Sequence, residues 1–324
     1  MEFKQKTIGV LSSGGDAPGM NAAIRSVVRT ALNRNIRVLG IRRGYSGLLA
    51  RDMFEMNLRS VSDTLHRGGT ILYSARCPEF RDDKGVERGK EVCLEMGIDG
   101  LVVIGGDGSF RGARDLSLKG IPCIGIPGTI DNDIASSDYT VGFDTAVNTV
   151  LSAVSNIRDT SSSHERATVI EVMGRHCGDI ALYAGLTGGA DNILVPEMPF
   201  DINKVCRKII QGKNRGKMHD IIMKAEGVGV DAKELAQLVE EKTGKETRVV
   251  ILAYLQRGGS PTAKDRMLAS RTASKAVELL YDDESSKAIG ICGSEIVAYD
   301  LEKALTIKRP FNADLYHLAD VLSK

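Results

Sequence analysis

Tryptophan is absent from the 324 residues, and aromatic residues make up only 5% of them. Proteins that bind single-stranded nucleic acid stack the bases on aromatic side chains, so this scarcity argues against that class. Lysine and arginine number 43 against 42 aspartates and glutamates, and the formal net charge is +1. Because such a charge creates no global attraction toward nucleic acid or an anionic membrane, basic clusters are interpreted as local sites.

Long hydrophobic runs are also missing, since no apolar stretch approaches the roughly 18 residues of a membrane-spanning helix. The opening MEFKQKTIGVLSSGG (1–15) is charged and lacks the apolar core of a secretory signal peptide. The six cysteines form no C-x-x-C pair and have no histidine partner at zinc spacing. We expect reduced, mostly buried thiols in a cytoplasmic protein.

Short runs rich in Val, Ile and Leu recur along the chain, and each ends in glycine or polar residues before a segment of helical period. The expected strands, some with the loop that follows, are 7–15, 37–49, 99–106, 122–128, 167–174, 219–227, 247–259 and 288–297. The first of them leads into an amphipathic helix at 20–35, and the serine-rich stretch 158–167 is interpreted as a loop. Continuous apolar strands separated by helices predict an α/β fold with mostly parallel sheets covered on both faces. Such sheets bind ligands at the carboxyl ends of their strands.

The stretch SSGGDAPGMN (12–21) joins the first expected strand to the first helix. Its three glycines let the backbone approach a ligand closely, and the following helix offers unpaired N–H groups to an anion. The stretch matches neither G-x-G-x-x-G nor G-x-x-x-x-G-K-[ST]. A bare tight turn is the alternative, but Asp16, Pro18 and Gly19 favour a phosphate site.

A second glycine-rich stretch, GGDGS (105–109), places the carboxylate of Asp107 among three glycines at a strand end. A carboxylate beside glycine amides suits Mg²⁺ and a polyphosphate together, because the cation takes oxygen ligands and the amides bind phosphate oxygens. An ordinary Asp-Gly turn is the alternative.

The third stretch, GTIDND (128–133), follows the next expected strand. If strand alternation continues, Thr129, Asp131 and Asp133 project to the same side. When two carboxylates lie so close, their repulsion raises the pKa of one of them unless a cation lies between them. Mg²⁺ at one and a substrate hydroxyl at the other would resolve this, and phosphoryl transfer needs such a base, a metal and cationic clamps. A solvated turn is the alternative.

Arginines recur beside these turns and strand ends, and arginine is a natural bidentate partner of phosphate. They are Arg76, Arg81, Arg166, Arg175, Arg248 and Arg257. Arg25 and Arg29 lie one helical turn apart and share a face, which is usually a solvated side.

Taken together, the motifs resemble those of the bacterial-type ATP-dependent 6-phosphofructokinases. The matching stretches are IGVLSSGGDAPGMNAAIR, RGGT, VVIGGDGS, GIPGTIDND, DTSSSHERATVIEVMGR, LQRGGSP and KRPF. The resemblance runs nearly end to end, whereas GGDG alone also occurs in NAD kinases and lipid kinases. It implies transfer of the γ-phosphoryl group of MgATP to the 1-hydroxyl of fructose 6-phosphate.

Residue roles follow from the same resemblance. Asp131 is the general base, Thr129 and Asp133 line the same site, Arg175 stabilises the transferring group and Asp107 holds Mg²⁺. The implied ATP site comprises Gly15, which also belongs to the implied catalytic set, and Tyr45, Arg76, Cys77, Gly106, Asp107, Gly108, Ser109 and Gly112. The implied sugar-phosphate site comprises Thr129, Asp131, Met173, Gly174, Arg175, Glu226, Tyr254 and Arg257.

The resemblance also implies a homotetramer with shared active and effector sites, in which Arg166 and Arg248 reach the substrate of a neighbouring subunit. A nucleotide or phosphoenolpyruvate effector would bind at Arg25, Arg29, Arg59, Asp63, Arg158, Gly189, Asp191, Arg215, Lys217 and His219. Two departures stand out. Tyr254 replaces a histidine that many members use for the sugar 6-phosphate, and Leu58-Arg59 replaces an Arg-Tyr pair of the effector site.

The expected architecture is two similar, doubly wound, three-layer α/β/α lobes with the active site in the cleft between them. Residues 1–142 with 256–306 would form the ATP-binding lobe, and 143–255 with 307–324 the fructose 6-phosphate-binding lobe. Gly108 and Gly128 favour ATP as donor, because pyrophosphate-dependent relatives characteristically carry Asp and Lys there. The rivals are a pyrophosphate-dependent or NAD-kinase-like phosphotransferase and a catalytically inactive regulatory paralogue. Intact Asp107, Asp131 and Arg175 argue against the last.

Overall fold

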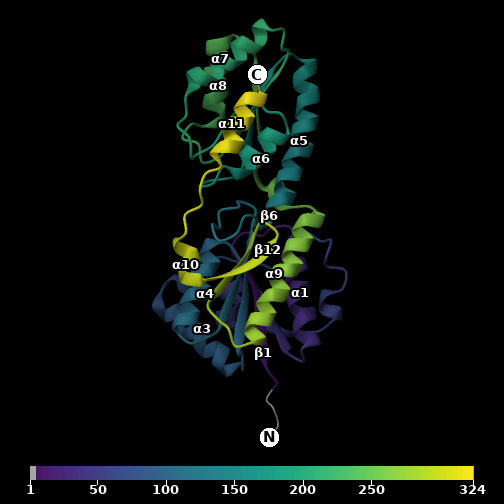
Figure 1. Cartoon of the computed structure of the whole chain (residues 1–324), viewed down its shortest axis with the longest axis vertical. Helices are drawn as coiled ribbons and strands as arrows, with labels where there is room; N and C mark the ends of the chain where they lie inside the picture. Colours follow the sequence, from purple (N-terminus) through teal and green to yellow (C-terminus); the bar gives the residue numbers. More distant parts are fainter. Residues whose placement is uncertain (1–4, 324) are drawn as a thin grey trace. The chain divides into compact units, whose positions relative to one another are not determined.

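The computed structural model describes residues 5–323, which divide into two compact units (Figure 1). The larger unit contains the described residues up to Thr145 together with Arg257–Arg309. The smaller unit contains Ala146–Gln256 and the described residues from Pro310 onward. Within residues 5–323, no helix combines the length and the apolar character that a membrane span requires.

The larger unit is built around a single mixed sheet. Its strands are β1 (Thr7–Ser13), β2 (Arg37–Ile41), β3 (Met53–Met56), β4 (Gly100–Gly105), β5 (Cys123–Thr129), β6 (Val141–Gly142), β11 (Lys287–Cys292) and β12 (Glu295–Asp300). Its helices are α1 (Met20–Asn33), α2 (Gly44–Ala50), α3 (Asp83–Glu95), α4 (Asp107–Leu118), α9 (Ala263–Tyr281) and α10 (Leu301–Thr306), with 3₁₀ turns η1 (Arg59–Val61) and η2 (Pro78–Arg81).

The sheet has the strand order β12-β11-β5-β4-β1-β2-β3, and β6 pairs with β5. Its central strands are parallel, whereas β3 and β12 pair antiparallel at the two edges. Every residue of β1 and β4 is buried, because their continuous apolar sequences are covered on both faces. Helices α1 and α9 lie side by side (Figure 1), and Ser26 Oγ donates to Ser270 O across their contact at 2.8 Å.

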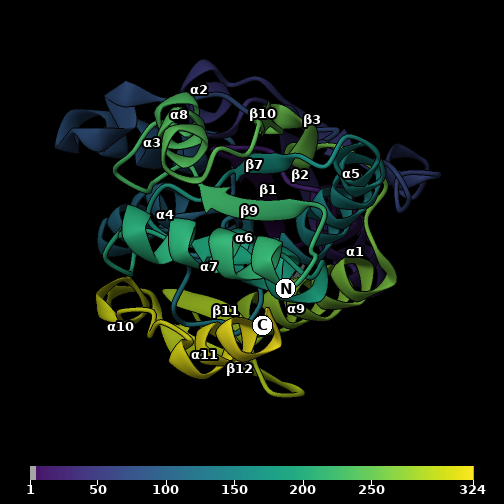
Figure 2. The same cartoon turned by 90° about the horizontal axis from the view of Figure 1, so that it is seen from above.

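The smaller unit is also a sheet covered by helices. It contains most of α5 (Phe143–Ser163), β7 (Ala167–Val172), α6 (Asp179–Thr187), β8 (Asn192–Leu194), α7 (Ile202–Asn214), β9 (Asp220–Ala225), α8 (Ala232–Thr243), β10 (Thr247–Ile251), most of the turn η3 (Ala253–Arg257) and α11 (Ala313–Leu322). The strand order is β10-β7-β9-β8, with parallel pairing throughout these four strands. Figure 2 shows β7 and β9 side by side at the centre of this sheet.

The predicted α/β fold with mostly parallel sheets is confirmed, but two local expectations were wrong. The run 288–297 is a hairpin rather than one strand, because Gly293, at φ +59, turns the chain between β11 and β12. The serine-rich stretch 158–167 is helical up to Ser163, since α5 continues through it. In α5, the hydroxyls of Ser155 and Ser163 donate to backbone carbonyls one turn earlier, which lets a serine remain in a helix.

Candidate active site

A cavity of about 540 Å³ opens in the larger unit at the carboxyl ends of β1, β4 and β5. The three stretches singled out in the sequence meet there, because the carboxyl ends of parallel strands share one edge of the sheet. The predicted residues that line it are Gly15, Tyr45, Arg76, Cys77, Gly106, Asp107, Gly108, Ser109, Gly112, Thr129, Asp131, Asp133 and Arg257. The cavity therefore collects all of the residues predicted for ATP binding and catalysis that belong to this unit.

One wall of the cavity is aromatic. Tyr45 is buried beneath Gly112, where a Cβ would overlap the tyrosine ring, and its hydroxyl donates to Ser109 O at 2.6 Å. Burial raises the pKa of Tyr45 well above its usual value, with smaller contributions from neighbouring Cys123 and Asp115. Phe80 stacks on the Tyr45 ring with a centroid separation of 4.1 Å and an interplanar angle of 14°. The sequence analysis missed Phe80, because a single aromatic residue in an irregular segment carries no periodic signal.

The T-I-D-N-D stretch is a turn and not an extension of the strand. Strand β5 ends at Thr129, whose Oγ1 accepts a hydrogen bond from Asp131 N at 3.2 Å. Asn132 adopts a left-handed conformation with φ 54, and its buried side chain accepts from Thr140 N at 2.9 Å. Alternation was therefore the wrong reason for grouping the three side chains, although Thr129, Asp131 and Asp133 do line one cavity. Asn132, which holds the turn, was also missed.

Gly15 has a structural partner that the sequence did not reveal. A Cβ at this position would overlap the guanidinium of Arg257, which packs directly over the glycine. Arg257 Nη1 also donates to Asp16 O at 3.2 Å. A side chain at position 15 would have to displace the flexible end of this arginine, which is 242 positions away in sequence. The guanidinium lies at the edge of the cavity.

Asp107 is the predicted metal ligand, and its carboxylate forms an ion pair with Arg111 at 2.8 Å, one turn along α4. This hydrogen bond raises the pKa of Arg111. Among the described residues, no group of three or more His, Cys, Asp or Glu side chains could hold a metal ion. Mg²⁺ characteristically binds one or two carboxylates and completes its shell with water and phosphate oxygens. The half-exposed carboxylate of Asp107 lies in the wall of this cavity and fits that kind of site.

The residues predicted to bind the sugar phosphate fall mainly in the smaller unit. Met173, Gly174, Arg175 and Glu226 directly follow the carboxyl ends of β7 and β9. Glu226 N donates to Val172 O at 2.8 Å, which extends the pairing of the two strands to these residues. They therefore form one cluster at one edge of the sheet.

Arg166 and Arg248 are not part of this cluster. Both pair with Glu246, at 2.8 and 2.5 Å, beside the amino ends of β7 and β10. Six residues of strand separate this edge from Met173, which is a span of about 20 Å. Tyr254 is 80% exposed. Within one chain, Arg166 and Arg248 therefore do not lie beside Met173, the predicted substrate residue at the carboxyl end of β7.

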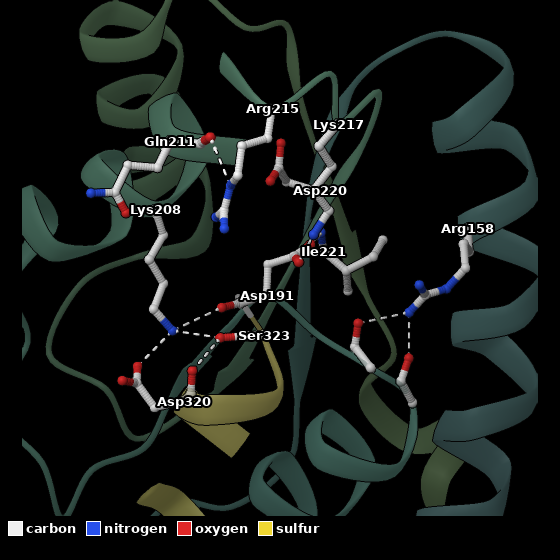
Figure 3. Close-up of polar contacts among 12 residues, drawn as sticks. Arg158, Asp191, Lys208, Gln211, Arg215, Lys217, Asp220, Ile221, Asp320 and Ser323 are labelled. Atoms are coloured by element: carbon white, nitrogen blue, oxygen red, sulfur yellow. Dashed lines mark hydrogen bonds and ion pairs between the residues drawn. The ribbon is translucent and has the colours of Figure 1, made fainter. Parts of the chain in front are cut away.

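The predicted effector residues are divided between the units. Arg25, Arg29, Arg59 and Asp63 belong to the larger unit, and Arg158, Gly189, Asp191, Arg215, Lys217 and His219 to the smaller one. Figure 3 shows Arg158, Asp191, Arg215 and Lys217 of the second group. Asp191 pairs with Lys217 and accepts from Ile221 N, while Arg158 donates to Gly189 O at 3.0 Å.

A second cavity, of about 280 Å³, is lined by Asp191, Arg215 and Lys217 of this group. Lys208, which the sequence analysis did not single out, lines it too and donates to Ser323 Oγ at 2.8 Å and to Asp320 Oδ1 at 2.6 Å (Figure 3). Burial is the main cause that lowers the pKa of Lys217. Burial also lowers the pKa of His219, with help from the positive charges of Arg158 and Lys217.

Glycine loops, carboxylates and arginines at the carboxyl ends of parallel strands define the class of α/β proteins built around a phosphate-binding edge. The family model for phosphofructokinase matches residues 7–280. ATP-dependent 6-phosphofructokinase from Clostridium botulinum (strain Loch Maree / Type A3) is 58% identical over 319 residues, covering 98% of this chain and 100% of that protein. This chain belongs to the phosphofructokinase family.

Further similarities agree with this membership. ATP-dependent 6-phosphofructokinase from Alkaliphilus metalliredigens (strain QYMF) is 58% identical over 318 residues, covering 98% of this chain and 99% of that protein. The solved structure of phosphofructokinase from Saccharomyces cerevisiae has a TM-score of 0.89 at 33% identity. That match covers 98% of this chain and 48% of the yeast chain, so this chain spans about half of its length.

Proposed function

We propose that this protein transfers the γ-phosphoryl group of ATP to the 1-hydroxyl of fructose 6-phosphate and releases ADP and fructose 1,6-bisphosphate. The observation that carries the proposal is the 540 Å³ cavity, in which Asp107, Thr129, Asp131 and Asp133 face glycine loops and Arg257. Full-length relatives at 58% identity with the name ATP-dependent 6-phosphofructokinase support the same reaction. In keeping with the scattered free cysteines, we assign the enzyme to the cytoplasm.

Asp131 acts as the general base and removes the proton of the attacking sugar hydroxyl. The turn that carries it is held by Asn132 and Thr140, whose hydroxyl donates to Thr129 O at 2.6 Å, so the carboxylate is positioned before substrate binds. Arg175 stabilises the negative charge of the transferring phosphoryl group. Asp107 would hold Mg²⁺, which neutralises phosphate charge when bound. Most of the catalytic contribution of the protein is thus orientation and charge stabilisation.

ATP is the proposed donor, and two glycines support it. A Cβ on Gly108 would have no atom within 4 Å, so this position leaves the cavity open for phosphates. A Cβ on Gly128 would lie 2.9 Å from Ile104 Cγ2 and 3.2 Å from Met20 Cε, so a lysine there would disturb the core below the cavity. Tyr45 and Phe80 supply an apolar wall for the adenine end of the nucleotide.

We further propose that the larger unit binds ATP, that the smaller unit binds fructose 6-phosphate, and that the enzyme is a homotetramer. The tetramer is favoured because Arg166 and Arg248 lie about 20 Å along the strand from Met173 and need another subunit's substrate to act on. A nucleotide or phosphoenolpyruvate effector would bind at the Asp191, Arg215 and Lys217 cavity.

A coupled assay of fructose 1,6-bisphosphate formation with Mg²⁺ tests the proposal. ATP and pyrophosphate are compared as donors, with fructose 6-phosphate as the acceptor. Turnover with ATP and fructose 6-phosphate alone is the expected result. Turnover only with pyrophosphate would overturn the donor assignment, and no turnover with either donor would favour a regulatory paralogue.

A further inference from the structure

Lys224 forms an almost fully buried ion pair with Glu171 in the smaller unit. The Nζ–Oε2 distance is 2.8 Å, and the two side chains are 1% and 19% exposed. Both residues lie at directly opposed positions of the neighbouring strands β9 and β7. Lys224 Nζ also donates to Ala225 O at 3.2 Å. Because a lysine is almost never so buried unless it is paired, Glu171 is what makes its burial possible.

The ion pair lies immediately beside the proposed sugar-phosphate residues. Lys224 and Glu171 are the second-last residues of β9 and β7, and Glu226 and Met173 are the first residues beyond the ends of these strands. The hydrogen bond from Glu226 N to Val172 O keeps the two strands paired up to this point. The Glu171 carboxylate therefore lies next to the edge at which a sugar phosphate would bind.

A dianionic phosphate near an uncompensated carboxylate is repelled, and a partly buried site screens this repulsion weakly. We infer that Lys224 is a positioning residue for sugar-phosphate binding, because its ammonium neutralises the Glu171 carboxylate and holds it away from the phosphate. The inference rests on the proposed function. It adds a charge-compensating pair beneath the site, and Lys224 itself does not touch the substrate.

The inference predicts effects of opposite sign for the two halves of the pair. Lys224→Met leaves a negative charge beside the site, and the Kd for fructose 6-phosphate should rise about ten-fold. Glu171→Gln removes that charge and leaves the cation, so the Kd should stay equal or fall. The double variant should return to within about three-fold of the wild type. The KM for ATP should not change in any of them.

Binding is measured by calorimetry with fructose 6-phosphate, and steady-state kinetics give both KM values. Lys245→Met is the matched control. Lys245 forms a similarly buried ion pair, at 2.6 Å, with Asp220, which lies at the amino end of β9, the strand that carries Lys224 near its carboxyl end. This control should lower the melting temperature without changing the Kd for fructose 6-phosphate.

A purely structural role would make Glu171→Gln bind fructose 6-phosphate as weakly as Lys224→Met, and that result would overturn the inference. So would a Lys224→Met variant with the wild-type Kd. If Lys224→Met does not fold, weaker binding of fructose 6-phosphate by Glu171→Gln still overturns the inference, because compensation predicts an equal or lower Kd. Failure of the proposed function is recognised separately: wild-type protein that binds fructose 6-phosphate without turnover refutes the kinase activity alone, and absence of binding refutes both.

Discussion

Gly108→Asp would introduce a carboxylate into the cavity that we assign to the phosphates of ATP. Gly108 is exposed, lines this cavity, and is the second residue of α4. Since a Cβ at Gly108 meets no atom within 4 Å, the new side chain has room to extend without disturbing the fold. The substitution therefore tests electrostatics rather than packing.

The magnitude follows from Coulomb's law. A like-charge pair about 5 Å apart at an effective dielectric constant of about 20 costs about 3 kcal/mol. The triphosphate presents several negative charges, and each 1.4 kcal/mol is ten-fold in affinity, so the Kd for ATP should rise by at least about 100-fold. Stability should be unchanged or slightly higher, because an acidic residue in the first turn of a helix contributes about 0.3–1 kcal/mol.

The assay combines calorimetric titration with ATP, thermal unfolding, and titration with fructose 6-phosphate. Gly108→Ala is the matched control, since it fills the same space without charge and should retain ATP binding. Loss of ATP binding in the aspartate variant alone, at normal stability and with normal fructose 6-phosphate binding, is expected. An aspartate variant that binds ATP like the wild type would refute the assignment of the cavity to phosphates.

Three other predictions address the base, the thiols and the half-buried His219. Asp131→Asn should lower kcat by about 10²–10⁴ while leaving the Kd of both substrates near the wild-type values, and normal turnover would remove Asp131 from the mechanism. Burial raises the pKa of Cys93 to about 12 and raises that of Cys123 further, so at pH 8 iodoacetamide should alkylate exposed Cys292 first and leave these two intact. ATP should protect Cys77, which lines the cavity, and mass spectrometry of digests reads out each site. Because the pKa of His219 is lowered on folding, the unfolded chain binds more protons than the folded chain just below pH 6.5. The contribution of His219 to stability is therefore complete above that pH and is lost as the pH falls through the lowered pKa. When thermal unfolding is measured between pH 5 and 8, the melting temperature should depend less steeply on pH for His219→Gln than for the wild type. Identical pH dependence of the two melting temperatures would contradict the lowered pKa of His219.

Much of the larger unit could be predicted from sequence because its signals are local. The runs that became β1, β4 and β5 are continuous and apolar, and glycines mark where they end. Their parallel pairing brings those ends to one edge, which is why three separate stretches of sequence line one cavity. The family resemblance added the roles of Asp131, Asp107 and Gly108, which periodicity alone could not assign.

Short edge elements were beyond this reasoning. Strands β3, β6 and β8 contain between two and four residues, and such lengths give too few positions for a period to be recognised. The hairpin of β11 and β12 was predicted as one strand, because its sequence contains an apolar run that does not show where one strand ends and the next begins.

The sequence by itself determined the class of fold, the order of its elements and the residues that carry the proposed chemistry, because hydrophobic period and glycine-rich turns act over a few neighbouring positions. Only the tertiary structure decided which distant side chains meet. Arg257 over Gly15, Phe80 on Tyr45 and Lys224 against Glu171 are contacts between segments far apart in the chain. Such contacts depend on how helices and strands pack, and packing is a property of the whole unit that no local pattern encodes.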